Sequence, residues 1–147
     1  MGNEEAILVA FTLSDGLYGV EVEQVREITA MRDVSPVPNS PDYVLGVTNL
    51  RGQVTTVTDL KKRLGSMSSE EPNKNSRIII VESEEALVGM AVDSVREVMR
   101  MPRDKIDSVP DVVSDFDVEA KYTRGIGKLK NGELIVLLDM VKILAEE

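Results

Sequence analysis

The side chains that most often perform catalysis are missing from this 147-residue sequence, which contains no histidine and no cysteine. Their absence excludes a Ser-His-Asp triad, a Cys-His pair and the usual zinc and haem ligands. Paired carboxylates are the remaining catalytic option, as in glycosidases and aspartic proteases. An aspartic protease needs Asp-Thr-Gly or Asp-Ser-Gly in each half, but Asp15 is followed directly by Gly16 and has no counterpart. A hydrolase with two carboxylates about 5–9 Å apart stays open as an alternative.

Sites for metals, nucleotides and nucleic acids are also not indicated. The acidic run over residues 115–119 lacks the spacing of a calcium-binding loop and is typical of a solvated loop. Residues 125–127 (Gly-Ile-Gly) are too short for a dinucleotide fingerprint. The chain has three tyrosines, two phenylalanines and no tryptophan, too few to stack bases along a basic groove. We therefore expect no cofactor, no metal and no nucleic-acid partner, and protein–protein interaction becomes the favoured class.

An internal duplication supplies the elements that would position a binding site. Residues 18–28 align with residues 88–98, with identities at Gly19/Gly89, Val22/Val92, Val25/Val95, Arg26/Arg96 and Glu27/Glu97. Both halves also end alike, since Asp59-Leu60 matches Asp139-Met140. The halves cover about 6–64 and 77–144, and a polar linker over 65–76 is expected to be a flexible loop.

The hydrophobic pattern within each half alternates mainly with period two, which predicts short β-strands. Strands are expected over 6–13, 17–22, 43–50 and 54–60, and tight hairpin turns at 14–16 and at Asn131-Gly132. About five strands in each half, without the helices of βαβ units, predict an all-β fold of two small barrels. A short amphipathic helix is expected over 140–147, packed on a barrel end.

One apolar stripe in each half breaks this alternation. Val22, Val25 and Ile28 in the first half, and residues 92, 95 and 98 in the second, stand at the i, i+3, i+6 spacing of one helix face. We therefore place a short helix or irregular turn there. Such a stripe belongs either to the core or to the edge of a groove that binds a partner helix.

The sharpest difference between the copies lies in a turn, where Asn49-Leu50-Arg51-Gly52 stands against residues 128–132. Arg51 carries a planar cation that can hold a carboxylate through two hydrogen bonds, and Gly52 permits the sharp reversal. Glu27 is the carboxylate that we expect to meet Arg51. The pair could brace one barrel, take part in binding, or do both.

These residues resemble the CheW family of chemotaxis coupling proteins. The likeness rests on the motifs at 46–52 (Gly-Val-Thr-Asn-Leu-Arg-Gly), 57–60, 18–22 and 25–28, and it covers nearly the whole chain as one CheW-like domain, residues 1–147. The resemblance implies two intertwined five-stranded SH3-like barrels. It also implies a noncatalytic adaptor that links transmembrane chemoreceptors to the histidine kinase CheA. The alternative is a barrel-type protein-binding scaffold in another signalling system.

The resemblance also implies where the partners bind. It places the receptor-binding groove at Val22, Val25, Glu27 and Ile28, with Val95 opposite. It marks Glu27 and Arg51 as a functional pair, with a turn shaped by Asn49 and Gly52. It places kinase contacts at Val44, Leu45 and Gly46, and a second contact on the loop from Asp107 to Val112.

The expected location follows from the apolar runs and the N-terminus. No stretch approaches the ~18 apolar residues of a membrane span, and the first residues lack the features of a signal peptide. We expect a cytoplasmic protein, monomeric on its own, that its partners recruit to membrane-associated receptor arrays without inserting into the membrane.

Overall fold

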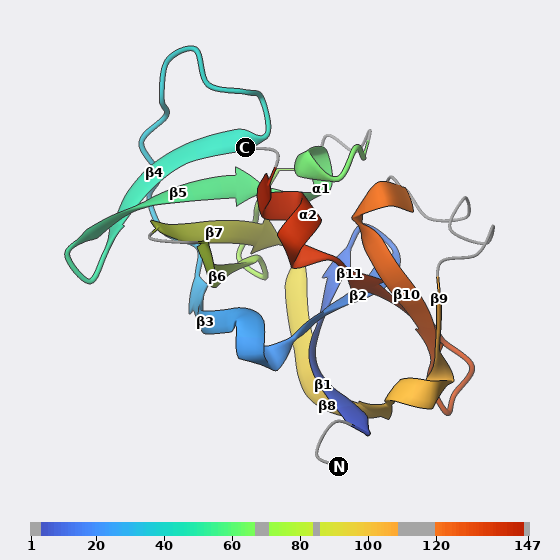
Figure 1. Cartoon of the computed structure of the whole chain (residues 1–147). Coiled ribbons are helices and arrows are strands. Elements are labelled where there is room, and N and C mark those ends of the chain that lie inside the picture. Colours follow the sequence, from blue (N-terminus) through green and yellow to red (C-terminus); the bar gives the residue numbers. More distant parts are fainter. Residues whose placement is uncertain (1–3, 67–70, 84–85, 109–119, 146–147) are drawn as a thin grey trace.

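The fold was analysed in a computed structural model that describes residues 4–66, 71–83, 86–108 and 120–145. It consists of two β-sheets with short helices between and beside them (Figure 1). The elements of the first copy are β1 (Glu5–Leu13), β2 (Gly16–Glu21), the 3-10 turn η1 (Val22–Gln24), β3 (Val25–Ala30), β4 (Val44–Leu50), β5 (Gln53–Asp59) and α1 (Leu60–Arg63).

The second copy repeats the order of strands and of the final helix, with three short additions (η2, β9 and η4) and without a counterpart of η1. Its elements are β6 (Arg77–Ser83), β7 (Ala86–Val92), β8 (Ser94–Pro102), η2 (Arg103–Lys105), β9 (Ile106–Ser108), η4 (Ala120–Tyr122), β10 (Thr123–Lys128), β11 (Leu134–Leu138) and α2 (Met140–Ala145). By position, β6, β7, β8, β10 and β11 correspond to β1 to β5, and α2 corresponds to α1. Among the described residues no helix is long and apolar enough to cross a membrane.

The two copies are intertwined, as the family resemblance implies. The six-stranded sheet has the order β8-β1-β2-β11-β10-β9, and the five-stranded sheet has the order β3-β6-β7-β5-β4. Each sheet therefore combines the first two strands of one copy with later strands of the other. Four strand pairs join the copies: the parallel pairs β2/β11 and β5/β7, and the antiparallel pairs β1/β8 and β3/β6. The remaining pairs are antiparallel and lie within one copy. Neither sequence half forms a sheet of its own.

The barrels are strongly curved sheets and not closed ladders. The six-stranded sheet curls round on itself in Figure 1, but among the described strands no pairing joins its two edge strands, β8 and β9. A smaller cluster of buried residues lies within this sheet, formed by Ala6, Leu8, Ala10, Leu17, Met101, Ile135 and Leu137. Another lies in the five-stranded sheet, formed by Leu50, Val57, Ile78, Ile80 and Ala91.

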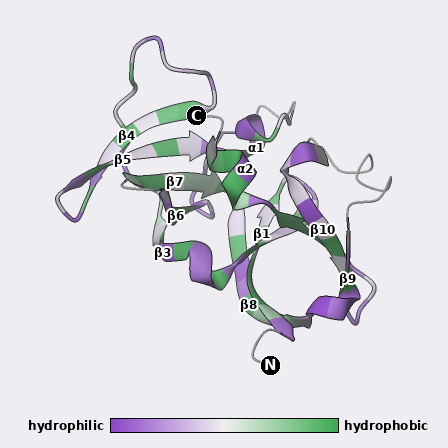
Figure 2. Cartoon of the chain, viewed as in Figure 1, coloured by the Kyte–Doolittle hydropathy of each residue, from purple (hydrophilic) through white to green (hydrophobic). Residues whose placement is uncertain are grey.

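The largest core cluster connects the two sheets. It includes Phe11 of β1, Ile79 of β6 and Ile143 of α2, each of them at most 2% exposed. Burial of one such side chain stabilises the fold by about 1.5–3 kcal/mol. Figure 2 shows hydrophobic residues along the strands and on α2, with hydrophilic residues at the turns and on α1. The faces by which the two sheets meet thus share one core, and the two smaller clusters lie on the opposite faces of the same strands.

The prediction of a short helix or irregular turn at each apolar stripe is confirmed only at the start of the stripe and is wrong for the rest of its length. Only Val22 lies in a helical turn, η1, whereas Val25 and Ile28 lie on strand β3, and the second stripe runs from β7 into β8 without a helix. The pairing of β3 with β6 shifts between Val25 and Glu27, and that of β8 with β1 shifts at the equivalent place. Such a β-bulge adds one residue to a strand. The extra residue changes the spacing between side chains on one face of the strand from two positions to three, which resembles the spacing on one face of a helix.

Both hairpin turns are present. Residues 14 and 15 connect β1 to β2, and the turn before β11 is closed by a hydrogen bond from the Gly132 amide to the Leu129 carbonyl, 2.9 Å. The described part of the linker also forms a turn, in which the Ser76 amide donates to the Asn73 carbonyl at 3.0 Å.

Candidate functional site

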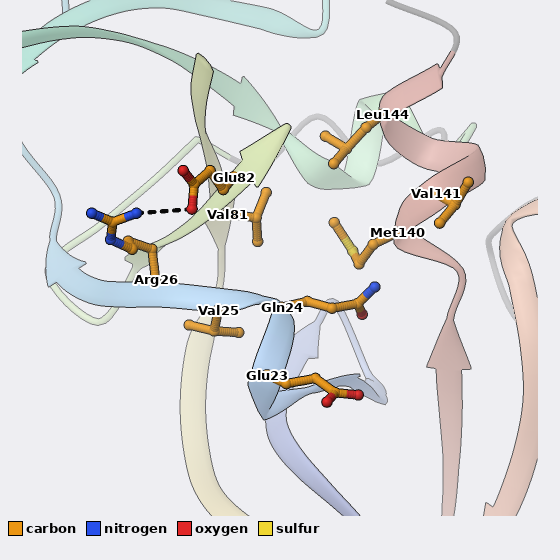
Figure 3. A pocket seen from close by; sticks show the side chains of 9 residues that line it. All are labelled: Glu23, Gln24, Val25, Arg26, Val81, Glu82, Met140, Val141 and Leu144. Atoms are coloured by element: carbon orange, nitrogen blue, oxygen red, sulfur yellow. Dashed lines mark hydrogen bonds and ion pairs between the residues drawn. The ribbon is translucent and has the colours of Figure 1, made fainter. Parts of the chain in front are cut away.

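An open groove of about 330 Å³ lies between the start of β3, the end of β6 and helix α2 (Figure 3). Its sides come from both copies, because β3 belongs to the first copy and α2 ends the second. Its lining combines five apolar side chains with three charged ones and one amide. The lining residues are Glu23, Gln24, Val25, Arg26, Val81, Glu82, Met140, Val141 and Leu144.

The position of α2 follows from a cap and from the burial of one face. Asp139 Oδ1 accepts a hydrogen bond from the Lys142 amide at 3.2 Å, as an N-cap side chain does at a helix start. Met140 and Ile143 stand three positions apart and are both 2% exposed. Their burial turns Val141 outward, where its side chain is 71% exposed at the groove. A valine so exposed beside an apolar floor is available to a partner.

Only part of the receptor groove implied by the resemblance lies in this cavity. Val25 lines it, whereas Val22 and Ile28 are exposed beside it, at 37% and 38%. Val95 is partly buried against the main core, as Val25 is, and is not among the lining residues. Glu27 lies one residue beyond Arg26 on β3, outside the lining.

Sequence reasoning missed one complete side of this groove, the side formed by α2 and by Val81 of β6. The amphipathic pattern of residues 140–147 was a usable signal, but it predicted only that the helix packs on a barrel end. The structure buries Met140 and exposes Val141, because consecutive residues of a helix point in directions about 100° apart.

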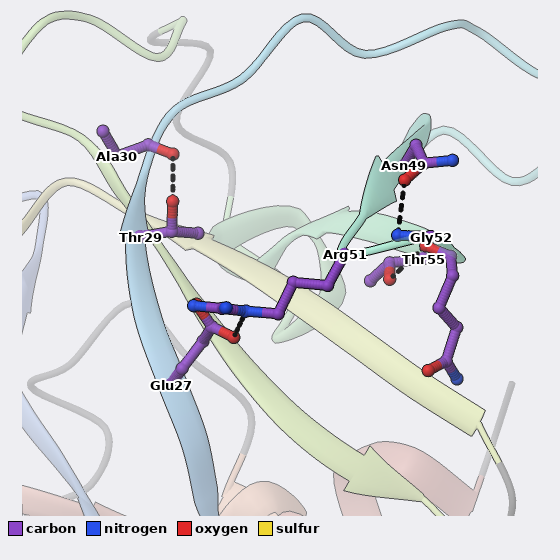
Figure 4. Close-up of polar contacts among 8 residues, drawn as sticks. Glu27, Thr29, Ala30, Asn49, Arg51, Gly52 and Thr55 are labelled. Carbon is purple, nitrogen blue, oxygen red and sulfur yellow. Dashed lines mark hydrogen bonds and ion pairs between the residues drawn. The ribbon is translucent and has the colours of Figure 1, made fainter.

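Glu27 and Arg51 meet across the end of the five-stranded sheet (Figure 4). Arg51 Nε donates to Glu27 Oε1 at 2.9 Å, and its Nη2 donates to Oε2 at 3.2 Å. The hydrogen bond to Arg51 holds the pKa of the Glu27 carboxyl below its ordinary value. The same bond raises the pKa of the Arg51 guanidinium. The structure therefore contains the two-pronged ion pair that the turn asymmetry predicted.

The β4–β5 turn presents Arg51 to Glu27. Arg51 and Gly52 both have positive φ angles, 53° and 85°, which suits a two-residue turn between antiparallel strands. Asn49 Oδ1 accepts a hydrogen bond from the Gly52 amide at 2.9 Å (Figure 4). A positive φ is uncommon for a residue with a side chain. Asn49 and Gly52 thus stabilise a conformation that points Arg51 across to β3.

The strand expected to contact the kinase offers less side-chain surface than its sequence suggests. Val44 and Leu45 are half-buried, while Gly46 is buried. The segment before β4 crosses Gly46, because Ser35 and Val47 exchange two backbone hydrogen bonds of 2.8 and 2.9 Å. A Cβ atom on Gly46 would lie 2.2 Å from the Ser35 carbonyl oxygen. Gly46 therefore permits a close crossing of the backbone and presents no side chain to a partner.

The second expected kinase contact is described only at its start. Asp107 is exposed on β9, which forms one edge of the six-stranded sheet. Val112 lies outside the described residues.

The two buried acidic side chains of the described strands have structural partners. Glu21 is held by Arg103 and Arg124, with N···O distances of 2.9 and 2.7 Å. Asp59 caps α1, and burial raises the pKa of its carboxyl. Among the described residues there is no group of three acidic side chains arranged to hold a metal ion. The groove thus combines apolar and charged side chains at one surface.

Comparison with known proteins gives consistent matches over almost the whole chain. The family model of the CheW-like domain matches residues 8–147. The chain is 35% identical over 140 residues to the chemotaxis protein CheW of Rhizobium meliloti, covering 95% of this chain and 88% of the relative. It is 33% identical over 146 residues to the chemotaxis protein CheW of Helicobacter pylori, covering 99% and 86%.

A solved structure shows the same fold. The scaffolding protein TtCheW from Thermoanaerobacter tengcongensis superposes with a TM-score of 0.81 at 32% sequence identity. The match covers 92% of this chain and 84% of that one.

Proposed function

Because the chain belongs to the CheW-like domain family, we propose that it is a noncatalytic adaptor that couples chemoreceptors to the histidine kinase CheA. It has one groove for the receptor and a separate surface for the kinase, and it uses no cofactor. It acts as a cytoplasmic monomer that its partners recruit to membrane-associated receptor arrays.

The observation that carries this proposal is the groove between β3 and α2. Its apolar residues Val25, Val81, Met140 and Leu144 form a strip with charged residues at its edges, and Val141 is exposed at one side. An amphipathic helix fits such a groove by laying its apolar face on the strip. The cytoplasmic tip of a receptor is the helical partner that we propose for it.

The kinase surface is proposed on the β4 side of the five-stranded sheet. Val44 and Leu45 supply the apolar contact, and Asp107, with Val112 further along the chain, supplies a second contact. β4 is an edge strand, and Arg51 at its end reaches across to Glu27 on β3, the opposite edge strand. The Glu27–Arg51 pair therefore connects the strand beside the receptor groove to the strand that contacts the kinase.

The proposed mechanism is a change in conformational population. Each partner contributes one interface of modest size, and a movement of the receptor on the groove favours one kinase conformation over another. The adaptor transmits this preference only if both interfaces are occupied together.

The receptor interface is tested by calorimetric binding of a receptor cytoplasmic fragment from the same organism to the purified chain. Val141→Asp is the test variant, because its side chain is exposed and its loss leaves the core intact. We expect it to weaken receptor binding at least tenfold while the thermal midpoint stays within a few degrees. Unchanged affinity would contradict the placement of the receptor on this groove.

The kinase interface is tested with the CheA regulatory domain and a matched pair of truncations. Leu45 and Leu87 are both partly buried against the same core cluster, so alanine at either position removes similar packing. Only Leu45 lies on the proposed kinase surface. We expect Leu45→Ala to weaken kinase binding more than Leu87→Ala. Equal effects would exclude a contact at Leu45, and failure of the unmodified chain to bind either partner would overturn the proposed function.

A further inference from the structure

The duplication provides an internal comparison for the groove, because α1 and α2 occupy equivalent positions. Each helix follows the last strand of its copy and begins at an aspartate, Asp59 or Asp139. The two carboxylates accept a hydrogen bond from the amide three residues later, at 3.4 and 3.2 Å. Lys61 and Val141 are therefore equivalent, since each stands two residues after the capping aspartate. Figure 2 shows the result, with α1 hydrophilic and α2 hydrophobic.

The strands opposite these helices are equivalent too. The sequence alignment of the copies places Glu23 and Gln24, beside α2, at the positions of Asp93 and Ser94, beside α1. The start of β8 and helix α1 thus form the counterpart of the groove, again with one element from each copy, and a lysine stands in place of the exposed valine.

At this counterpart the polar side chains have partners within the chain, while Asp93 and Ser94 also line an open pocket of about 410 Å³. Lys61 is only 5% exposed, and its Nζ lies 3.0 Å from Asp93 Oδ1. The other oxygen of Asp93 accepts the Ser14 amide at 2.6 Å, and the hydroxyl of Ser94 is 2.7 Å from that of Thr12. Pro72 and Ser76 of the linker line the small cavity that is left there. Both polar positions of the second copy are therefore satisfied internally.

In the first copy the equivalent positions have no such partners. Among the described residues the Glu23 side chain makes no hydrogen bond or ion pair, and Gln24 Oε1 is buried without a hydrogen-bond partner. The other two charged residues of the groove, Arg26 and Glu82, pair with each other at 2.8 Å. Figure 3 shows Glu23 and Gln24 extending toward the side of the groove on which α2 lies. The groove therefore has one uncompensated carboxylate beside its apolar strip.

We propose that Glu23 selects the occupant of the groove, and that the occupant is an amphipathic helix that brings a lysine or arginine to Glu23. This cation takes the part that Lys61 takes beside Asp93 in the second copy. The apolar face of the same helix covers Val25 and Val141. The inference rests on the proposed function, since that helix belongs to the receptor. Opposite charges across an interface favour the correct partner and exclude helices that present an acidic residue there.

The test measures the affinity of a receptor cytoplasmic fragment from the same organism for three variants at low and high salt. Glu23→Lys reverses the charge and Glu23→Gln removes it. Asp104→Lys makes the same change in net charge at an exposed residue of η2 that does not line the groove. Thermal midpoints and binding to the CheA regulatory domain are measured beside them. All three changes lie on exposed or groove-lining side chains, so each variant should fold.

We expect Glu23→Lys to weaken receptor binding about 5- to 30-fold at low salt, and Glu23→Gln to have a smaller effect. The loss should shrink at high salt, because ions screen exposed charges. Asp104→Lys should bind the receptor as the unmodified chain does. Kinase binding should be unchanged in all three variants.

Receptor binding that is the same for Glu23→Lys and the unmodified chain would overturn this inference and leave the proposed function intact. An equal loss in Asp104→Lys would also overturn it, because the effect would then belong to net charge and not to Glu23. Failure of the unmodified chain to bind the receptor fragment would overturn the receptor part of the proposed function as well.

Discussion

At the scale of single residues, the Glu27–Arg51 pair combines an exposed ion pair with an unusual backbone conformation. The Arg51 side chain is 77% exposed, and exposed ion pairs contribute little to folding stability. Arg51 nevertheless has a positive φ of 53°, which a residue with a side chain adopts only when the surrounding turn imposes it. The ion pair thus adds little to folding stability, although the turn imposes an uncommon backbone conformation on Arg51. This combination supports the role in binding that we propose for the pair.

The pH dependence of this pair follows from the direction of its pKa shift. The pKa of Glu27 is lowered by the hydrogen bond from Arg51, so the pair contributes fully above the ordinary pKa of a glutamate. Its contribution is lost as the pH falls through the lowered pKa of the folded state. The pair is therefore intact throughout the neutral range.

Arg51→Ala and Lys130→Ala test whether this residue acts in signalling. Lys130 lies in the corresponding hairpin turn of the second copy, and it is exposed. We expect Arg51→Ala to reduce kinase activation or inhibition in reconstituted receptor–kinase complexes at least severalfold, and Lys130→Ala to leave it unchanged. Both variants should unfold within a few degrees of the unmodified chain. Equal effects in the coupling assay would argue against a functional site on the first copy.

At the scale of elements, the β4–β5 hairpin depends on two glycines for different reasons. Gly46 is crossed by the Ser35 segment, whereas a Cβ on Gly52 would meet no atom within 4 Å. Gly52 needs only its positive φ of 85°. One glycine thus maintains the packing of the edge strand, and the other maintains the shape of the turn.

Alanine at each glycine separates these two requirements. Gly52→Ala should lower the free energy of unfolding by about 1–2 kcal/mol, the cost of a left-handed conformation for a residue with a Cβ atom. Gly46→Ala should lower it further, because the Ser35 segment must also move away. Urea unfolding of the two variants measures the difference. A smaller loss for Gly46→Ala than for Gly52→Ala would contradict the close crossing described above.

The start of α1 shows a conflict between capping and burial. Asp59 Oδ1 caps the helix through the Lys62 amide, yet burial raises the pKa of its carboxyl above the ordinary value of 3.8. A raised pKa means that the folded state binds the proton more tightly than the unfolded state does. The stabilising effect of the bound proton is complete below pH 3.8 and is lost as the pH rises through the pKa of Asp59 in the folded state.

Asp59→Asn should remove this pH dependence and keep the cap, because asparagine caps helices about as well as aspartate. We expect the stability of Asp59→Asn, relative to the unmodified chain, to improve as the pH rises from 3 to 7. Asp59→Ala lacks any cap and should lose about 1 kcal/mol at pH 7. Chemical unfolding across this pH range gives both values. A relative stability of Asp59→Asn that falls with rising pH would show that the carboxylate charge is favourable in the folded state.

At the scale of the whole molecule, one buried arginine links the two copies. Arg63 of α1 is 6% exposed, and its guanidinium lies 5.1 Å from the ring centroids of both Tyr43 and Tyr122. It donates hydrogen bonds to the Tyr122 hydroxyl at 2.7 Å and to the Ile143 carbonyl at 2.6 Å. Tyr43 belongs to the first copy, whereas Tyr122 and Ile143 belong to the second. Arg63 therefore stabilises the contact between them through cation–π and hydrogen-bond interactions.

Arg63→Ala should lower the free energy of unfolding by about 3 kcal/mol, since it leaves a cavity and two buried oxygen atoms without their donor. Arg63→Lys should lose less stability than Arg63→Ala, because lysine retains the positive charge. It should still lose some stability, since lysine lacks the planar geometry of the guanidinium. The measurement is guanidinium chloride unfolding followed by circular dichroism. Stability equal to that of the unmodified chain in Arg63→Ala would mean that Arg63 does not hold the copies together.

Features that depend on local pattern could be predicted from the amino-acid sequence alone. The duplication, the main strands, the two hairpin turns and the C-terminal helix follow from periodicity and turn residues. The Glu27–Arg51 pair followed from a difference between two aligned turns. The β-bulges led to the wrong prediction at the two apolar stripes, because an extra residue in a strand produces the spacing of a helix face.

The pairing of the strands and the set of residues that form the groove could not be predicted in this way and depend on the three-dimensional fold. Val25 and Val141 are more than a hundred positions apart, and they share one groove because each sheet takes strands from both copies. The exposure of Val141 and the burial of Lys61 are opposite outcomes at equivalent positions. They depend on what covers each helix, because the linker lies beside Lys61 of α1 whereas Val141 of α2 faces solvent. Local sequence carries no information about such long-range contacts, since they arise from the shared core of the whole chain.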